Sequence, residues 1–108
     1  AGSMLGTRAL QIFDETTCVV RAVLRWTEFY AHESCGKCTP CREGTFWLKN
    51  MIRQFLDDVG DETLAQRVDR TAGQIIGTTI CAFGDAVGEP MQSFVRKFPE
   101  DFARHYAS

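Results

Sequence analysis

The sequence has no apolar run that approaches the roughly 18 residues of a membrane-spanning helix, and it has no signal peptide with a basic start and an apolar centre. Basic residues are not in excess either: 12 Lys and Arg stand against 14 Asp and Glu, for a formal net charge of −2. A strongly basic chain is typical of partners of nucleic acid or of anionic membranes. We therefore expect no nucleic-acid binding and no direct membrane insertion.

Other absences concern nucleotides and disulfides. The glycines are scattered and form no glycine-rich nucleotide loop. Internal repeats and low-complexity segments are also missing. The five cysteines are too few for the disulfide framework of a small secreted domain, and three of them are bunched within residues 35–41. This pattern favours metal or cluster binding in a reducing cytosol.

The 108 residues suffice for one compact domain. The opening AGSM (1–4) is predicted to be a cloning remnant. In residues 5–13, Leu10 and Ile12 alternate with a polar residue, which predicts an orphan strand or linker from a preceding domain. Residues 14–108 are the predicted helical domain.

Apolar residues recur at helical spacing in the rest of the chain. Helices are predicted over 16–32, 40–58, 61–77 and 90–98, followed by a short one over 100–106. The predicted start signals are Asp14 to Thr17 for the first helix, Thr39-Pro40 for the second, Asp61 for the third and Pro90 for the fourth. Gly60 is predicted to end the second helix. Amphipathic helices with short connections predict an all-α four-helix bundle.

The apolar stripes also name inward-facing residues. They are Val19, Val20, Val23, Leu24, Trp26, Phe29, Tyr30, Leu48, Met51, Ile52, Phe55, Val59, Leu64, Val68, Ala72, Ile75, Met91, Phe94, Val95 and Phe98. Phe46 and Trp47 are expected in the core, or alternatively beside the cysteine loop. Cys18, among valines, is expected to be a buried structural thiol, and His105 is expected at the surface.

The chemistry-bearing motif is a group of three closely spaced cysteines and one remote cysteine. Cys35, Cys38 and Cys41 have two residues between each successive pair and belong to the predicted cysteine loop between the first two helices. Cys81 lies in the loop between the third and fourth helices. A cubane [4Fe-4S] cluster takes one thiolate on each of four irons, which suits this division. Zinc sites usually take two ligands from each of two segments, so a structural zinc site is the less favoured alternative. Four unligated thiols are the least favoured hypothesis.

Neighbouring residues fit an anionic group. Gly36 allows a tight turn. Lys37, Arg42 and the backbone amides that begin the second helix are expected to offset the negative charge of a cluster and its thiolates. His32, three residues before Cys35, is a less favoured substitute ligand.

Residues 33–44, ESCGKCTPCREG, resemble the signature of the flavoprotein subunit of NADH:quinone oxidoreductase, respiratory complex I, which is called NuoF in bacteria and the 51-kDa subunit in mitochondria. The resemblance continues in FYAH (29–32), ICAFGDA (80–86) and residues 90–98. It implies a four-helix bundle at the C-terminus of that subunit, in which Cys35, Cys38, Cys41 and Cys81 ligate the [4Fe-4S] cluster named N3. It further implies an electron relay that accepts single electrons from FMN reduced by NADH.

The same resemblance implies partners and a location. The partners are the FMN- and NADH-binding domain of the same subunit and the neighbouring iron–sulfur subunits, which receive the electrons. FMN and NAD are expected to bind only in that missing domain, so this chain alone should not turn over NADH. The expected location is the peripheral arm of a membrane complex, cytoplasmic in bacteria. Flavin subunits of NAD-linked hydrogenases and formate dehydrogenases share the signature and are alternative parents.

Overall fold

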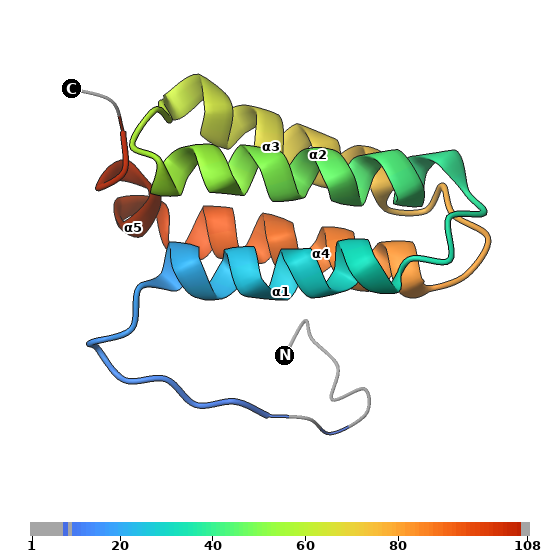
Figure 1. Ribbon diagram of the computed structural model, residues 1–108, viewed down its shortest axis with the longest axis horizontal. Coiled ribbons are helices and arrows are strands. Elements are labelled where there is room, and N and C mark those ends of the chain that lie inside the picture. The colour runs from blue at the N-terminus through green and yellow to red at the C-terminus, as the bar shows by residue number, and fades with distance from the viewer. Residues whose placement is uncertain (1–7, 9, 107–108) are drawn as a thin grey trace.

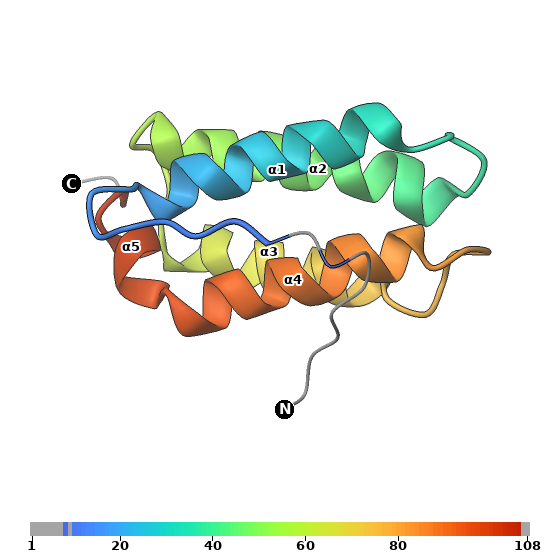
Figure 2. The same ribbon diagram turned by 90° about the horizontal axis from the view of Figure 1, so that it is seen from below.

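Helices make up most of the computed structural model, which describes residue 8 and residues 10–106. The elements are α1 (Val19–Glu33), α2 (Thr39–Leu56), α3 (Glu62–Ile75), α4 (Phe83–Lys97) and the short α5 (Pro99–Ala103). The four long helices lie side by side, and successive helices run antiparallel (Figure 1). Turning the molecule shows the pair α1–α2 packed on the pair α3–α4 (Figure 2). The predicted four-helix bundle is confirmed.

The alternation of direction decides which connections meet. The α1–α2 and α3–α4 connections lie at one end of the bundle, on the right in Figure 1. The start of α1, the α2–α3 turn and α5 lie at the other end. Both predicted cysteine loops are therefore at the same end, although they are far apart in sequence.

The core runs along the bundle axis and is almost entirely apolar. Its buried members are Val20, Val23, Leu24, Leu48, Ile52, Phe55, Leu64, Val68, Ala72, Ile75, Val87, Met91 and Phe102. Two buried threonines are satisfied locally, because each hydroxyl donates to the carbonyl four residues earlier: Thr27 to Val23 at 2.6 Å and Thr45 to Cys41 at 2.7 Å. Within the described residues, no helix is long and apolar enough to cross a membrane.

The first helix begins later than predicted. Oδ1 of Asp14 accepts hydrogen bonds from the hydroxyl of Thr16 (2.5 Å) and from its backbone N–H (3.0 Å). These bonds hold the pKa of Asp14 below its usual value. They also give the backbone a turn in place of a helix, so α1 begins only at Val19, with Cys18 as its N-cap.

The other helix starts agree with the prediction to different degrees. Asp61 caps α3 as predicted, because its Oδ1 accepts the N–H of Leu64 at 2.8 Å. In α2 the N-cap is Cys38, and Thr39 is already the first helical residue. Proline still stands within the first turn, where its missing N–H costs no helical hydrogen bond.

Pro90 lies inside α4 and does not open it, because this helix begins at Phe83. An interior proline removes one helical hydrogen bond and crowds the carbonyl four residues earlier, at a cost of about 3 kcal/mol. The helix forms because it buries Val87 and Met91 completely, which contributes about 1.5–3 kcal/mol for each side chain. The free energy of tertiary packing thus offsets the local cost of the proline, and this packing cannot be read from the sequence pattern.

Gly60 does not end α2, which stops at Leu56. The left-handed residue after the helix is Asp58, with φ +58°, and aspartate tolerates this conformation better than most residues. Gly60 is required for another reason: a Cβ at that position would lie 2.6 Å from a ring carbon of Phe55. The glycine permits close packing and does not terminate the helix.

Five residues predicted to be inward or core are instead at the surface. They are Phe29 (59% exposed), Phe46 (50%), Trp47 (52%), Val59 (60%) and Phe98 (40%). Val59 and Phe98 lie beyond the ends of their helices. Phe29, Phe46 and Trp47 lie outside the buried faces of α1 and α2, whose limits the spacing of apolar residues alone does not define. Within the predicted orphan strand or linker over 5–13, residues 8 and 10–13 have no regular secondary structure. Residues 1–7 and 9 lie outside the described part.

Candidate iron–sulfur site

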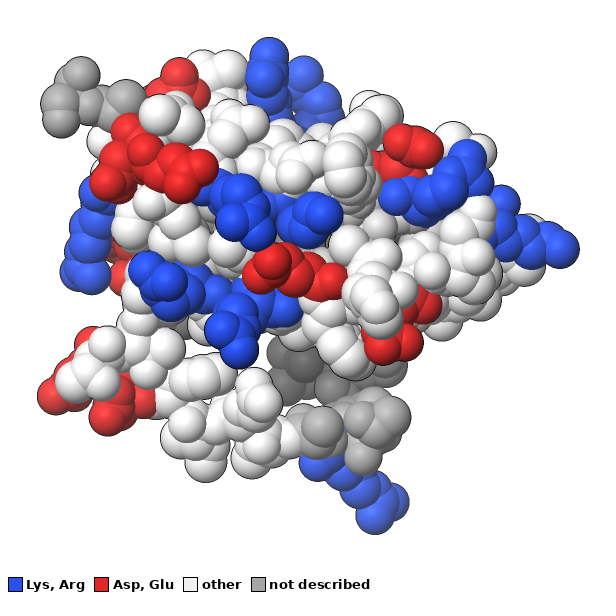
Figure 3. Space-filling model, in the orientation of Figure 1, with Lys and Arg blue, Asp and Glu red and all other residues white. Residues whose placement is uncertain are grey.

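Two loops form the candidate site at one end of the bundle. Residues 34–38 join α1 to α2, and residues 76–82 join α3 to α4. Each loop turns at a glycine in the left-handed conformation, Gly36 (φ +79°) and Gly77 (φ +76°), which a residue without a Cβ adopts at little cost. Charges of both signs cover the face in Figure 3, and basic side chains stand at the tip that carries the loops.

Arg42 and Ser34 hold the first loop. The Arg42 guanidinium donates through Nη1 to the carbonyl of Gly36 at 2.6 Å and through Nη2 to the hydroxyl of Thr39 at 3.3 Å. The Gly36 N–H donates to Oγ of Ser34 at 3.3 Å. The guanidinium therefore ties the loop to the first turn of α2 and limits its freedom. From its sequence position Arg42 was expected only to balance charge, but it also has this structural role.

The second loop is tied to the start of α4. The N–H of Gly77 donates to Oδ1 of Asp85 at 2.7 Å, and Asp85 lies in the first turn of α4. The hydroxyl of Thr79 donates to the carbonyl of Cys81 at 2.8 Å. Gly84 lies against this threonine, because a Cβ there would come within 3 Å of three Thr79 side-chain atoms. Cys81 is thereby held facing the first loop.

All four predicted ligand cysteines line one cavity of about 130 Å³ between the loops. The cavity is lined by Glu33, Ser34, Cys35, Lys37, Cys38, Cys41, Thr79, Cys81 and Phe83. Cys41 is buried, Cys38 is half-buried, and Cys35 and Cys81 are exposed. The volume is several times the roughly 30 Å³ that one water molecule occupies in the liquid. The cavity is therefore large enough for a group of several atoms.

Two polar groups point at the sulfurs. Oγ of Ser34 lies 3.2 Å from Sγ of Cys41, and the backbone N–H of Ile80 donates to Sγ of Cys38 at 3.4 Å. A thiolate only accepts hydrogen bonds, so in that state the serine hydroxyl is the donor. Ile80 belongs to the opposite loop, so its amide joins the two halves of the site. Neither group was predicted. The hydroxyl of Ser34 stands next to a candidate ligand cysteine in the sequence and could have been noticed, whereas a backbone amide leaves no signal in the sequence.

The electrostatic surroundings suit negative charge. The positive end of the α2 dipole lies at the site, and the first turn of α2 contains no acidic residue. Lys37 lines the cavity, although Glu33 does so as well.

In the described part of the chain, no three or more His, Cys, Asp or Glu side chains are grouped closely enough to hold a single metal ion.

Two residues weighed in the sequence lie outside this cavity. His32 is 86% exposed and its Nδ1 lies 3.6 Å from a carboxylate oxygen of Glu33. Cys18 was expected to be buried, but it is exposed. The reason is that α1 begins after it, so Cys18 caps the helix at the far end of the bundle and does not share the inner face of α1.

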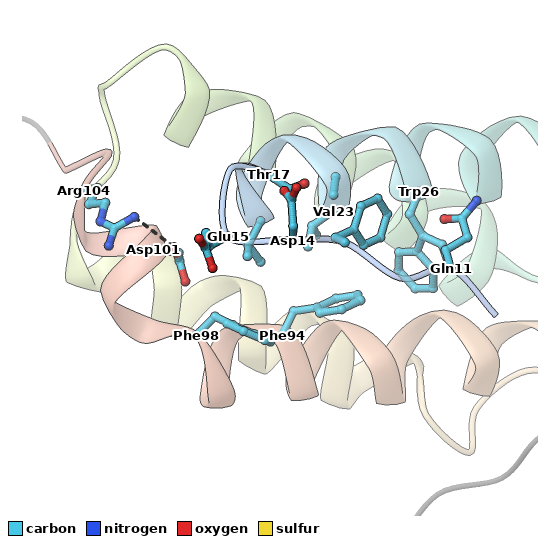
Figure 4. A pocket seen from close by; sticks show the side chains of 13 residues that line it. Gln11, Asp14, Glu15, Thr17, Val23, Trp26, Phe94, Phe98, Asp101 and Arg104 are labelled. Carbon is cyan, nitrogen blue, oxygen red and sulfur yellow. Dashed lines mark hydrogen bonds and ion pairs between the residues drawn. The ribbon is translucent and has the colours of Figure 1, made fainter.

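A larger cavity of about 600 Å³ lies at that far end (Figure 4). The segment before α1 covers one side of it, and α1, α4 and α5 form the rest. Its lining is apolar around Trp26 and Phe94 and polar around Asp101 and Arg104, which pair at 3.3 Å. The smaller cavity is nevertheless the candidate site, because all four predicted ligand cysteines line it.

Comparison with known proteins identifies the family. Residues 21–105 match the model of the NADH-ubiquinone oxidoreductase-F iron-sulfur binding region. The chain belongs to this family. The matched range contains both cysteine loops and every helix except the first two residues of α1.

The relatives agree with this assignment. The chain is 55% identical over 105 residues to the F subunit of the NADH-quinone oxidoreductase of Streptomyces coelicolor, covering 97% of this chain and 23% of the relative. It is 46% identical over 103 residues to the mitochondrial NADH-ubiquinone oxidoreductase 51 kDa subunit of Neurospora crassa, covering 94% and 21%. The chain thus spans about a quarter of the length of these relatives.

A solved structure shares the fold. An NAD⁺-reducing [NiFe]-hydrogenase in its H₂-reduced state superposes with a TM-score of 0.81 at 26% identity, over 87% of this chain and 16% of the hydrogenase chain. The bundle therefore also occurs inside a larger redox protein of a different kind.

Proposed function

We propose that this chain is an electron-relay domain that holds one [4Fe-4S] cluster through Cys35, Cys38, Cys41 and Cys81. The observation that carries the proposal is the shared cavity: thiols from the first loop, the first turn of α2 and the second loop, which is far away in sequence, line a space large enough for several atoms. Membership of an iron–sulfur binding family supports it independently. A bound cluster would supply one-electron redox chemistry.

The residues of this chain have distinct proposed roles. The four thiolates would ligate the irons. Ser34 and the Ile80 amide would hydrogen-bond to two of the sulfurs, and such bonds tune the reduction potential. Partial burial behind Phe83 would limit water on one side. The two exposed cysteines mark the side from which electrons would enter or leave.

In the parent protein, we propose that the domain accepts single electrons from FMN that NADH has reduced, and passes them to the clusters of neighbouring subunits. The similarity to the Streptomyces coelicolor protein favours a NADH-quinone oxidoreductase parent, with the domain in the peripheral arm. FMN and NADH would bind in the part of the parent protein that this chain does not include. The chain by itself should not turn over NADH.

The test is anaerobic reconstitution with iron and sulfide, followed by metal analysis and spectroscopy. We expect about four irons and four sulfides per chain, a brown protein and an absorption band that dithionite bleaches. A colourless protein with one zinc per chain would replace the proposal with a structural zinc site. For the isolated chain we expect a bound cluster and no turnover of NADH.

Alanine variants show which thiols are ligands. Replacing Cys35, Cys38, Cys41 or Cys81 should lower the iron content or change the electron paramagnetic resonance spectrum of the reduced protein. Cys18→Ala is the matched control and should leave both unchanged. If Cys18→Ala has the same effect as Cys81→Ala, the ligand set is wrong.

A further inference from the structure

Three functional side chains meet at the end of the bundle opposite the cysteine loops. Sγ of Cys18 lies 3.7 Å from Nε2 of His105, and Nδ1 of His105 lies 3.3 Å from Oδ1 of Asp58. They come from the N-cap of α1, the turn after α2 and the segment after α5. The cysteine is exposed. A nucleophile, a base and a third group that orients the base are the parts of an activated nucleophile.

The donors and acceptors determine where the ring proton lies. A carboxylate only accepts hydrogen bonds, so Nδ1 of His105 carries the ring hydrogen, and this N–H donates a hydrogen bond to Oδ1 of Asp58. The other ring nitrogen, Nε2, then directs its lone pair at the thiol of Cys18. It is therefore placed to accept the thiol proton. Cys18 also caps the fifteen-residue helix α1, whose first turn has no acidic residue, and a helix N-terminus favours negative charge.

Core packing holds the histidine in this position. Phe102 is 1% exposed and meets the ring of Phe55 edge-on, with centroids 5.1 Å apart. Tyr106 packs on the same ring at 6.2 Å and forms a backbone bridge with Gly60. Residues on both sides of His105 are thus anchored to α2 and to the turn that follows it. The ion pair with Asp58, which is 72% exposed, orients the ring but contributes little stability.

We propose that Cys18 is a modification site, a thiol that exchanges with low-molecular-weight disulfides. His105 acts as its base, and Asp58 orients His105. Nε2 takes the thiol proton, and Sγ attacks one sulfur of the disulfide. A new S–S bond forms as the old one breaks, and the leaving thiolate takes the proton from Nε2. The products are a mixed disulfide on Cys18 and one free thiol, with His105 restored.

This site is separate from the proposed relay site. The fifteen residues of α1 extend about 22 Å at 1.5 Å per residue, and Cys18 and the first cysteine loop lie at opposite ends of that helix. The proposal therefore does not depend on whether a cluster binds. Modification is expected to leave the four thiols of the other end in place.

The test uses the full chain and 2-hydroxyethyl disulfide, an uncharged probe, at neutral pH. Trypsin separates the cysteines, because Cys18 falls in the peptide that ends at Arg21 and the loop cysteines lie beyond Arg25. Mass spectrometry of quenched samples then gives the rate at Cys18 alone. An ordinary thiol is only a few per cent thiolate at pH 7. We therefore expect Cys18 to react about tenfold faster in the folded chain than in the same chain unfolded in urea.

Three variants identify the cause of that acceleration. His105→Gln should reduce the rate to that of the unfolded chain, and Asp58→Asn should reduce it severalfold. Asp57→Asn removes the same charge one residue earlier and should change nothing. Circular dichroism verifies the fold, and the exposed Asp58 keeps the test decisive if His105→Gln does not fold. Equal rates in folded and unfolded chains, or full acceleration in folded His105→Gln or Asp58→Asn, would overturn the proposal.

Discussion

Replacing Cys81 with alanine should remove most of the stability that a bound cluster gives to the fold. Cys81 is the proposed ligand from the second loop, and a link from it through the cluster to Cys41 closes about 40 residues of chain. Closing a loop of that length lowers the entropy of the unfolded chain by the equivalent of about 4 kcal/mol. Small domains have a net stability of about 5–15 kcal/mol, so this is a large share.

The protein's own contact between the loops is much weaker. The Ile80 N–H reaches Sγ of Cys38 at 3.4 Å, and a single hydrogen bond contributes about 1 kcal/mol net. Without the link the two loops are therefore expected to separate before the helices unfold. Hydrogen exchange at the amides of residues 77–82 should increase when the cluster is removed.

The assay is anaerobic chemical denaturation of cluster-loaded and cluster-free protein, for the wild type, Cys81→Ala and the matched control Cys18→Ala. The difference between loaded and free forms should be about 4 kcal/mol for the wild type and the control, or about 15–30 °C in Tm. It should fall to about 1 kcal/mol or less for Cys81→Ala. An equal difference in all three proteins would refute the reasoning that the cluster links the loops.

Three further outcomes follow from the described contacts. Ser34→Ala removes a hydrogen bond to Sγ of Cys41. In the cluster-loaded protein this bond would favour the reduced cluster, which carries more negative charge. A redox titration of the loaded variant should therefore show the reduction potential of the cluster lowered by about 60 mV. Gly88→Ala places a Cβ 2.7 Å from the carbonyl of Ala72 and should destabilise the chain by about 1–3 kcal/mol in urea. Burial of the hydroxyl and the negative charges of Glu62 and Asp61 raise the pKa of Tyr106 in the folded chain. As pH rises, the Tyr106 hydroxyl therefore ionises in the unfolded chain before it does so in the folded chain, and the free energy of unfolding should fall above about pH 10.

Each of these outcomes has a matched control. Ser34→Thr keeps the hydroxyl and should keep the potential. Gly73→Ala adds the same methyl group at an exposed site of α3, where the nearest atom is the amide nitrogen of Gln92. Displacing that nitrogen costs at most its hydrogen bond to the Asp69 carbonyl, about 1 kcal/mol, which the higher helix propensity of alanine offsets, so the net stability should change little. Tyr106→Phe removes the titrating group and should flatten the stability curve above about pH 10. A curve as steep as that of the wild type would mean that another group titrates there.

The sequence pattern predicts the buried faces of the helices better than it predicts where the helices begin. Val68, Ala72 and Ile75 were predicted to be inward from spacing, and they are buried, because a helical period needs only local geometry. Helix starts were less predictable. Asp14 begins a turn and not a helix, and Pro90 stands inside α4, because local signals compete with packing that a linear pattern does not contain.

Sequence alone determined the class of fold, the four candidate ligands and the family resemblance, because these depend on residue type and spacing along the chain. Only the tertiary structure decided how the two loops meet, since that requires antiparallel helices to return Cys81 to the end that carries Cys35. It also revealed the Ile80 amide at Sγ of Cys38 and the contact of Cys18 with His105. Such contacts join residues tens of positions apart, and the packing of the core alone sets their distance.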